Sequence, residues 1–421
     1  MDSVEENNEI SALVYNILNN FLNKEYGQGK YKYDIKGATK KGDNYLGVVY
    51  RITIQMLDND ENRHQLILKV PPQNLIRREK FFARPVFLRE ALAFEKFFPL
   101  ISEFQQAKGL SVQESFHEYP KYKFSSTDYM NEVICMDDLQ PQGFYLFDRF
   151  APLTVDHVSI LMRIYGKLHA TSLVIKDEKP ELLSELKQME DIFVQQKEYE
   201  PLHNYFENLK ANVLKCIDEQ QEHDYWSKLN DYLGNATIFD LMLKILDAKT
   251  SEPYSVICHG DCWINNIMYK CEIDQIKDAC LIDWQIMRYA SPVVDLMYFL
   301  MCCTTGEFRR KYFQNMLDVY HESASDHIKR LGGNAEKLYS RNGLDEELKR
   351  KGAIGLLFAT FVLPILTTKS EDVPDLEILS EKVAAGETID IEDSGIHGEN
   401  AILYNKRMHD VIIDTIDYGW I

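Results

Sequence analysis

The sequence is short of positive charge. Its 47 Lys and Arg residues face 66 Asp and Glu residues, which gives a formal net charge of −19 at pH 7. Such an excess of negative charge repels phosphate backbones and anionic lipids. We therefore do not expect nucleic acid or an anionic membrane as a partner. An anionic ligand would need a local cationic site or a metal ion.

Long apolar runs are also missing. The longest, residues 353–366, has 14 residues, whereas a helix needs about 20 to span a bilayer, so we interpret it as a buried helix. The first ten residues are acidic and lack the basic and apolar parts of an export signal. The eight cysteines are then expected to be free thiols, and we expect a soluble, cytoplasmic protein with no membrane span.

Two patterns that would identify a site by themselves are incomplete. A glycine-rich phosphate loop would follow G-x-G-x-x-G, but the corresponding loop has only Gly42 and Gly47. Cys258, His259 and Cys262 include residue types that bind zinc, yet no second Cys/His pair completes a tetrahedral set. We therefore expect no zinc.

The first third of the chain mixes helical and strand patterns. Apolar residues recur at three- and four-residue spacing in two segments, the second of them after Pro85, and they alternate with period two in others. The expected elements are helices at 10–22 and 86–98 and strands at 46–56, 66–70 and 133–136. A polar hairpin joins the first two strands.

From Pro141 onward the pattern becomes mainly helical, with Thr154 as the cap of a long helix. We expect these helices to be interrupted only by two short strands, at 255–258 and 278–282. An acidic stretch at 370–399 is expected to be a long loop. The sequence therefore predicts two units, residues 1–140 and 141–421.

The two short strands flank the residues that best indicate a chemistry. His259-Gly260-Asp261 and Asn266 follow the first strand, and Asp283 ends the second. Phosphoryl transfer needs a group that orients the attacking hydroxyl and a metal that offsets phosphate charge. Asp261 is the predicted catalytic acceptor of the hydroxyl proton, with an ordinary pKa of about 3.9. Asn266 and Asp283 are the predicted ligands of Mg²⁺. The simpler alternative is a turn with capping carboxylates.

Lys69 and Glu90 supply a second pair of charges. Lys69 points away from the apolar face of its strand, and Glu90 shares an apolar helix face with Phe87 and Phe94. A carboxylate on such a face is costly unless it is paired. We therefore predict a buried ion pair between Lys69 and Glu90 that reaches nucleotide phosphates. The alternative is a surface lysine and an unrelated glutamate.

Taken together, these residues resemble the aminoglycoside phosphotransferase and choline kinase superfamily. The sequence is more closely similar to the insect ecdysteroid kinase-like family over nearly its whole length. The motifs that carry this resemblance are Gly42-Asp43-Asn44-Tyr45, Phe87-Leu88-Arg89-Glu90, Met136-Asp137-Asp138-Leu139, Leu168-His169-Ala170, the His259 segment with Trp263, Ile282-Asp283-Trp284-Gln285 and Ser291-Pro292 before Asp295-Leu296.

The resemblance implies an α+β, two-lobed protein-kinase-like fold with a small antiparallel sheet lobe and a larger helical lobe. It implies ATP and Mg²⁺ between the lobes, with adenine near Met136 and Asp138, and it adds Asn44 to the nucleotide-binding residues. It also implies a steroid or similar lipophilic alcohol as acceptor, and Asp295 as a brace of the catalytic loop. Asp137 and Trp284 replace the usual Glu and Phe, which leaves the base and metal positions intact.

Several alternatives stay open at this level. His259 and His169 are interpreted as structural, and aromatic residues such as Trp263, Tyr289 and Tyr298 suit either a substrate pocket or the core. A choline- or aminoglycoside-type kinase and a nucleotide-binding scaffold are the rival functions. A protein kinase is not expected, because no Asp-Phe-Gly or Ala-Pro-Glu occurs where an activation loop would lie. Nothing in the sequence indicates an oligomeric state.

Overall fold

The computed structural model describes residues 10–38, 47–58, 63–80, 82–273, 275–373 and 395–421. Within them, an antiparallel sheet of five strands forms the amino-terminal part of the molecule, in the order β1-β2-β3-β5-β4. Its strands are β1 (Tyr31–Gly37), β2 (Val48–Met56), β3 (Arg63–Val70), β4 (Tyr122–Ser126) and β5 (Val133–Asp137). The expected strands at 46–56, 66–70 and 133–136 are present, whereas β1 and β4 were not predicted.

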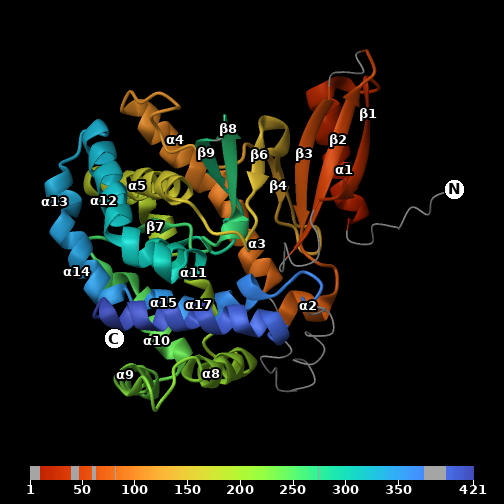
Figure 1. Ribbon diagram of the computed structural model, residues 1–421. Helices are drawn as coiled ribbons and strands as arrows, with labels where there is room; N and C mark the ends of the chain where they lie inside the picture. Colours follow the sequence, from red (N-terminus) through yellow and green to blue (C-terminus); the bar gives the residue numbers. More distant parts are fainter. Residues whose placement is uncertain (1–9, 39–46, 59–62, 81, 274, 374–394) are drawn as a thin grey trace.

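Helix α1 (Ala12–Leu22) covers one face of this sheet (Figure 1). Ser11 caps the helix, because its hydroxyl accepts a hydrogen bond from the Val14 N–H at 3.2 Å. The buried residues of the helix pack on the alternate residues of β2 and β3. This packing leaves the other face of β2 and β3, which carries Val49 and Lys69, directed toward the rest of the protein.

On that other side lies a nearly continuous helical segment. It consists of α2 (Leu75–Lys80), α3 (Ala83–Leu92), a π-helical turn (Ala93–Phe97) and α4 (Phe98–Ala107). The predicted helix at 86–98 is therefore longer than expected. It begins before Pro85, because the first N–H groups of a helix have no partner within the helix. A proline, which lacks an N–H group, is therefore tolerated in the first turn. In Figure 1 this segment stands between the sheet and the helical lobe.

The carboxy-terminal part is mainly helical. The long helix α5 (Val155–Glu178) starts at Thr154, which forms the predicted cap, and packs along α12 (Gly306–Arg330). Below them, α17 (Gly398–Asp417) lies against α15 (Ile354–Thr367), as Figure 1 shows. The other helices of this part are α6 (Ser184–Lys187), α7 (Ile192–Gln195), α8 (Glu200–Leu214), α9 (His223–Gly234), α10 (Ile238–Leu246), α11 (Val293–Cys303), α13 (Ala335–Tyr339) and α14 (Arg341–Lys351).

The expectation of only two strands in this part is wrong. Among the described residues, β7 (Val256–Cys258) pairs with β10 (Arg288–Ala290), and β6 (Phe144–Leu146), β8 (Ile267–Glu272) and β9 (Gln275–Leu281) form a second small sheet. The unpredicted strands β6 and β10 have only three residues each, which is too short for a reliable period-two pattern. The ends of the strands in these two sheets carry the loops that hold the polar residues described below.

The apolar run at 353–366 forms the buried helix α15, as predicted. Among the described residues, no single helix is both long and apolar enough to cross a membrane. The segment that contains α13 and α14 reaches that length only together with α15, and the two parts are bent by 61° relative to each other. Most of the acidic stretch predicted as a loop at 370–399 lies outside the described residues.

Candidate active site

Asp261 lies in the loop that begins where β7 ends. It is 8% exposed. Its Oδ1 accepts a hydrogen bond from the Tyr298 hydroxyl at 2.9 Å, and its Oδ2 accepts one from the Asn266 amide at 3.0 Å. Burial and the charge of Asp283 raise the pKa of Asp261 to about 6. The expectation of an ordinary aspartate pKa is therefore wrong, and the carboxylate is better suited to accept a proton near neutral pH.

The loop before Asp261 is held in one conformation. Gly260 has φ +84°, and a Cβ atom there would lie 2.1 Å from the carbonyl oxygen of Ile286, so only glycine fits without a shift of the backbone. The N–H groups of His259 and Gly260 donate to the Asp295 carboxylate at 2.8 and 2.9 Å. Asp295 therefore braces the loop from the first turn of α11.

Both histidines that the sequence assigned to structure are buried. His259 Nδ1 accepts the Asp261 N–H at 3.2 Å, which leaves Nε2 to donate to the Ile282 carbonyl at 3.0 Å. His169 Nε2 lies 3.2 Å from Asp295 Oδ2. Burial acts to raise the pKa of Asp295, but hydrogen bonds from His169 and the loop amides hold it below its usual value. The Asp295 carboxylate therefore stays ionised.

Asn266 and Asp283 lie side by side, because the Ile282 N–H donates to the Asn266 carbonyl at 3.0 Å. Asp283 has φ +67°, which is rare for a residue with a side chain. The amide nitrogen of Asn266 is engaged with Asp261. Its side-chain oxygen is therefore left to offer, together with the Asp283 carboxylate, of which one oxygen contacts Lys69, and Mg²⁺ prefers such oxygen donors. This pair of residues fits a magnesium ion.

The predicted ion pair between Lys69 and Glu90 is present, with Nζ 2.6 Å from Oε2. Both side chains are nearly fully buried, and Lys69 Nζ also contacts Asp283. Burial alone would lower the pKa of Lys69, yet the carboxylates of Asp283 and Glu90 raise it overall. The ammonium therefore stays charged, and it links the sheet, α3 and the segment that follows β9.

A cavity of about 140 Å³ lies between the sheet and the carboxy-terminal part. Its lining combines apolar side chains with charged and polar ones. The apolar residues include Val49, Ile67, Met136, Leu139, Met268 and Ile282, and the charged and polar residues include Arg51, Lys69, Glu90, Asp138, Asn266 and Asp283. This slot has the kinds of group that a nucleotide base and its phosphates contact, although its volume is below the usual range for small-molecule sites.

Met136 and Asp138, predicted to bind nucleotide, line this cavity in the segment that leaves β5. The Asp138 carboxylate is itself engaged, because it accepts hydrogen bonds from Arg51 Nε at 2.5 Å and from the Gln140 N–H at 3.0 Å. Its side chain therefore holds the connecting segment in place. Asn44 lies outside the described residues.

Among the residues that contact the site, Arg51 and Tyr298 were not assigned to it from the sequence. Arg51 shares a strand face with Val49, so the period-two pattern of β2 could have indicated it. Tyr298 was left open between pocket and core, and its hydroxyl donates a hydrogen bond to Asp261. Its spacing on the apolar helix α11 could not distinguish these two roles.

Comparisons with known proteins give one family match. The ecdysteroid kinase-like family model matches residues 41–333. No curated protein matches the chain. A solved GDP complex of a mutant aminoglycoside 2'-phosphotransferase-IIIa is 11% identical, with a TM-score of 0.44 over 96% of this chain and 99% of that one. An AMP-bound spectinomycin phosphotransferase is 12% identical, with a TM-score of 0.31 over 73% of this chain and 85% of that one.

Proposed function

The chain belongs to the ecdysteroid kinase-like family, and from that premise we propose that it transfers the γ-phosphate of ATP to a hydroxyl of an ecdysteroid or a similar lipophilic alcohol. The protein is a phosphotransferase that acts on a small-molecule hydroxyl, with a two-lobed kinase-like fold. The proposal adds ATP, Mg²⁺ and the class of acceptor, and it divides the lobes at residues 1–140 and 141–421.

One observation carries the proposal. Asp261, Asn266 and Asp283 lie together at the ends of β7 and β9, and Lys69 reaches them from the sheet. In this assignment Asn266 and Asp283 would hold Mg²⁺, which offsets the charge of the phosphates when bound. Lys69 binds the phosphates, and Glu90 holds Lys69 in place. Asp261 orients the acceptor hydroxyl.

In the proposed transfer, these groups account for the bond that forms, the bond that breaks and the proton that is released. The acceptor oxygen forms a bond to the γ-phosphorus, and the bond from that phosphorus to the bridging oxygen of ADP breaks. The hydroxyl proton passes to a carboxylate oxygen of Asp261. Tyr298 and Asn266 hold that carboxylate by hydrogen bonds, so it is oriented before the acceptor arrives.

Adenine is the base that we assign to the apolar slot. No described residue accepts a hydrogen bond from the Leu139 N–H, which lies in the segment that lines the slot. Adenine offers a ring nitrogen as acceptor at the edge where guanine carries an N–H donor. A free backbone donor at this place can pair with that ring nitrogen, which supports adenine in the slot.

We also place the protein in the cytoplasm. All eight cysteines are free thiols in the structure, and free thiols are usual in a reducing compartment.

The test is phosphate transfer to a mixed panel of alcohols. We expect purified protein with ATP and Mg²⁺ to add one phosphate to an ecdysteroid, seen as a gain of one phosphate mass by mass spectrometry. The Asp261→Asn variant should lose at least about 100-fold in turnover, because general-base groups contribute that much. The surface variant Asp326→Asn is the matched control and should keep full activity.

The same panel separates the rival functions. Transfer to choline or aminoglycosides but to no steroid would replace the lipophilic acceptor with a cationic one. ATP binding without transfer to any acceptor would contradict the enzyme assignment and favour a nucleotide-binding scaffold.

A further inference from the structure

Arg89 lies next to Glu90 on α3 but reaches the other part of the molecule. Consecutive residues of a helix are about 100° apart around its axis, so Arg89 faces the carboxy-terminal part while Glu90 faces Lys69. There its guanidinium donates hydrogen bonds to the carbonyl oxygens of Met287 at 2.9 Å and of Glu190 at 2.5 Å. Arg89 is 6% exposed. The proposed function gives it no role.

The first acceptor, Met287, belongs to the turn that follows Asp283. The Met287 N–H donates to the carbonyl oxygen of Trp284 at 3.1 Å, which closes this turn directly after Asp283. The hydrogen bond from Arg89 to the Met287 carbonyl therefore fastens α3 to the turn beside one of the predicted magnesium ligands.

These contacts close a ring around the buried ammonium of Lys69. Lys69 pairs with Glu90 on α3 and with Asp283 before the turn. Glu90 is joined through the helix backbone to Arg89, and Arg89 holds the Met287 carbonyl on the turn. An arginine fork fixes direction as well as distance. One guanidinium therefore sets the separation of the two carboxylates that hold Lys69.

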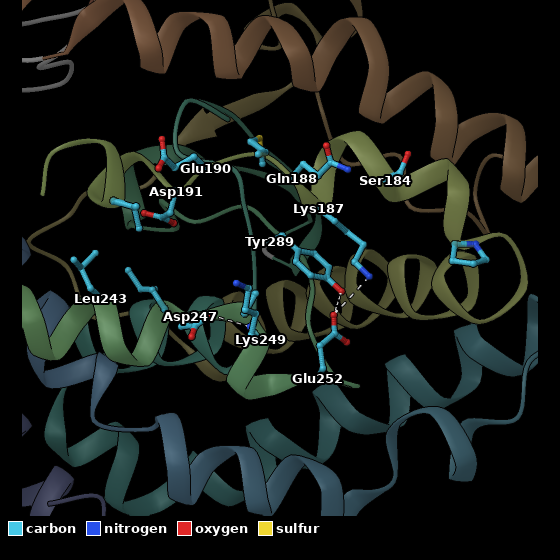
Figure 2. A pocket seen from close by; sticks show the side chains of 15 residues that line it. Ser184, Lys187, Gln188, Glu190, Asp191, Leu243, Asp247, Lys249, Glu252 and Tyr289 are labelled. Carbon is cyan, nitrogen blue, oxygen red and sulfur yellow. Dashed lines mark hydrogen bonds and ion pairs between the residues drawn. The ribbon is translucent and has the colours of Figure 1, made fainter.

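The second acceptor, Glu190, belongs to the segment between α6 and α7. This segment lines a cavity of about 860 Å³, and α10 with the turn after it lines the opposite side, as Figure 2 shows. Glu190 and its neighbour Asp191 are both part of this lining. The guanidinium of Arg89 therefore joins α3, the turn after Asp283 and a wall of this cavity.

The rest of the helical segment is anchored beyond its π-helical turn. At the start of α4, the Phe98 ring lies 4.9 Å from the Trp284 ring and 3.8 Å from the Tyr119 ring, between ring centres. The π-helical turn, Ala93–Phe97, lies between this aromatic anchor and Arg89. A π-helical turn interrupts the regular hydrogen bonds of a helix, so the anchor constrains α3 less than an unbroken helix would. Arg89 supplies a second fixed point.

Charge by itself does not account for Arg89, because both of its acceptors are neutral carbonyl groups. Asp191 lies closer to a second buried arginine, Arg288, with Oδ2 3.2 Å from Nη1, and the three guanidinium nitrogens of Arg288 make no hydrogen bond of good geometry to a described residue. Burial lowers the pKa of Arg89 to about 10, which the charge of Asp191 opposes and that of Arg288 reinforces. The guanidinium stays protonated at neutral pH, and its directed hydrogen bonds distinguish it from a lysine.

We propose that Arg89 is a positioning residue for the nucleotide phosphates, because it holds Glu90 and Asp283 at the separation at which Lys69 directs its ammonium toward them. The inference rests on the proposed function, which assigns Lys69 to the phosphates. Arg89 does not line the slot assigned to adenine. Its loss should therefore weaken the binding of ATP and leave the binding of adenosine, which has no phosphate, unchanged.

The test measures binding by the purified full chain, so it does not depend on turnover. Titration calorimetry compares a non-hydrolysable ATP analogue, with Mg²⁺ present, and adenosine. We expect Arg89→Met to weaken binding of the analogue by about tenfold or more and to leave that of adenosine within about twofold. Arg89→Lys, which keeps the charge but offers no fork, should also weaken binding of the analogue alone.

A double-mutant cycle asks whether Arg89 acts through Lys69. Lys69→Met should weaken binding of the analogue, and Arg89→Met added to Lys69→Met should change the affinity by less than about twofold further, because residues that act through one group are not additive. A residue that only stabilises the fold would give additive losses and would weaken adenosine as well.

Arg309→Met is the matched control. Arg309 is also buried and donates to the carbonyl oxygens of Met301 and Thr304, but it lines no part of the slot. The variant should lower Tm and keep both affinities. An unchanged affinity for the analogue in Arg89→Met and Arg89→Lys, an equal loss for adenosine, or additive losses in the cycle would each overturn the inference.

Failure of the proposed function gives a different result. The expected binding pattern without phosphate transfer to any alcohol would refute the proposed function and support the role of Arg89. No binding of the ATP analogue to the wild-type protein would refute both.

Discussion

At the scale of single residues, Asp261 shows how position changes chemistry. The side chain is an ordinary carboxylate, yet burial near the charge of Asp283 raises its pKa to about 6. Tyr298 donates to one of its oxygens and Asn266 to the other. The residue type could be predicted to act on a hydroxyl proton, but the proton affinity depends on groups that the chain supplies from a different loop and helix.

Gly260 offers a test of the loop that positions Asp261. Gly260→Ala should destabilise the protein by about 1–3 kcal/mol more than Gly109→Ala, because both positions have φ above +80° but only a Cβ at 260 meets a backbone oxygen. Urea unfolding measures the difference, and phosphate transfer should fall only in the Gly260 variant. Equal stabilities would show that the loop shifts freely and that its tight contact has no role.

At the scale of elements, the helical segment of α3 and α4 connects the two parts of the molecule. Glu90 faces the sheet, where it binds Lys69, while Arg89 reaches the carbonyl oxygens of Met287 and Glu190 in the other part. A helical period predicted the pairing of Glu90 correctly. It could not predict the partners of Arg89, since these lie about 100 and 200 positions away in the sequence.

The contact between α12 and its neighbours predicts how stability depends on pH. His327 on α12 is buried against Gln105 and Thr171, and burial, with a smaller effect of Lys167, lowers its pKa to about 4. The unfolded chain has a histidine pKa of about 6.5, so between these values the unfolded state binds more protons. Stability should therefore fall as the pH drops from 6.5 toward 4, by about 2 kcal/mol at pH 5.

His327→Gln tests this dependence. The variant should lose about 2 kcal/mol of the difference between the free energies of unfolding at pH 7 and pH 5, measured by urea titration at both values. His397→Gln, which changes a solvent-exposed histidine, should keep the wild-type difference. An unchanged pH dependence in His327→Gln would contradict the assignment.

At the scale of the whole molecule, the negative net charge opposes the binding of a nucleotide. A protein with a formal charge of −19 repels the triphosphate, and Lys69 is already paired with two carboxylates. Nucleotide binding should therefore depend on a metal held by Asn266 and Asp283.

Thermal unfolding measures that dependence. ATP with Mg²⁺ at about 100 times its dissociation constant should stabilise the protein by about 2.7 kcal/mol, and EDTA should remove most of the resulting rise in Tm. Asp283→Asn should show little rise even with Mg²⁺. The same rise with and without EDTA would exclude a metal from nucleotide binding.

The sequence by itself determined the elements with strong periodicity and the residue types of the site. The helix at 86–98, the strands around Lys69 and the motif from His259 to Asn266 could all be predicted, because side-chain periods and motif spacing are local properties. The strands β6 and β10 could not, since each has three residues and pairs with a segment far away in the sequence.

Only the tertiary structure decided how these residues act together. The pKa of Asp261, the double pairing of Lys69, the bond from Arg51 to Asp138 and the unsatisfied Arg288 beside Asp191 all depend on distances between segments far apart in the chain. Electrostatic effects and hydrogen bonds act through space, and burial sets their strength. Composition and spacing therefore indicated which reaction to expect, while the fold decided which groups surround Asp261 and Lys69.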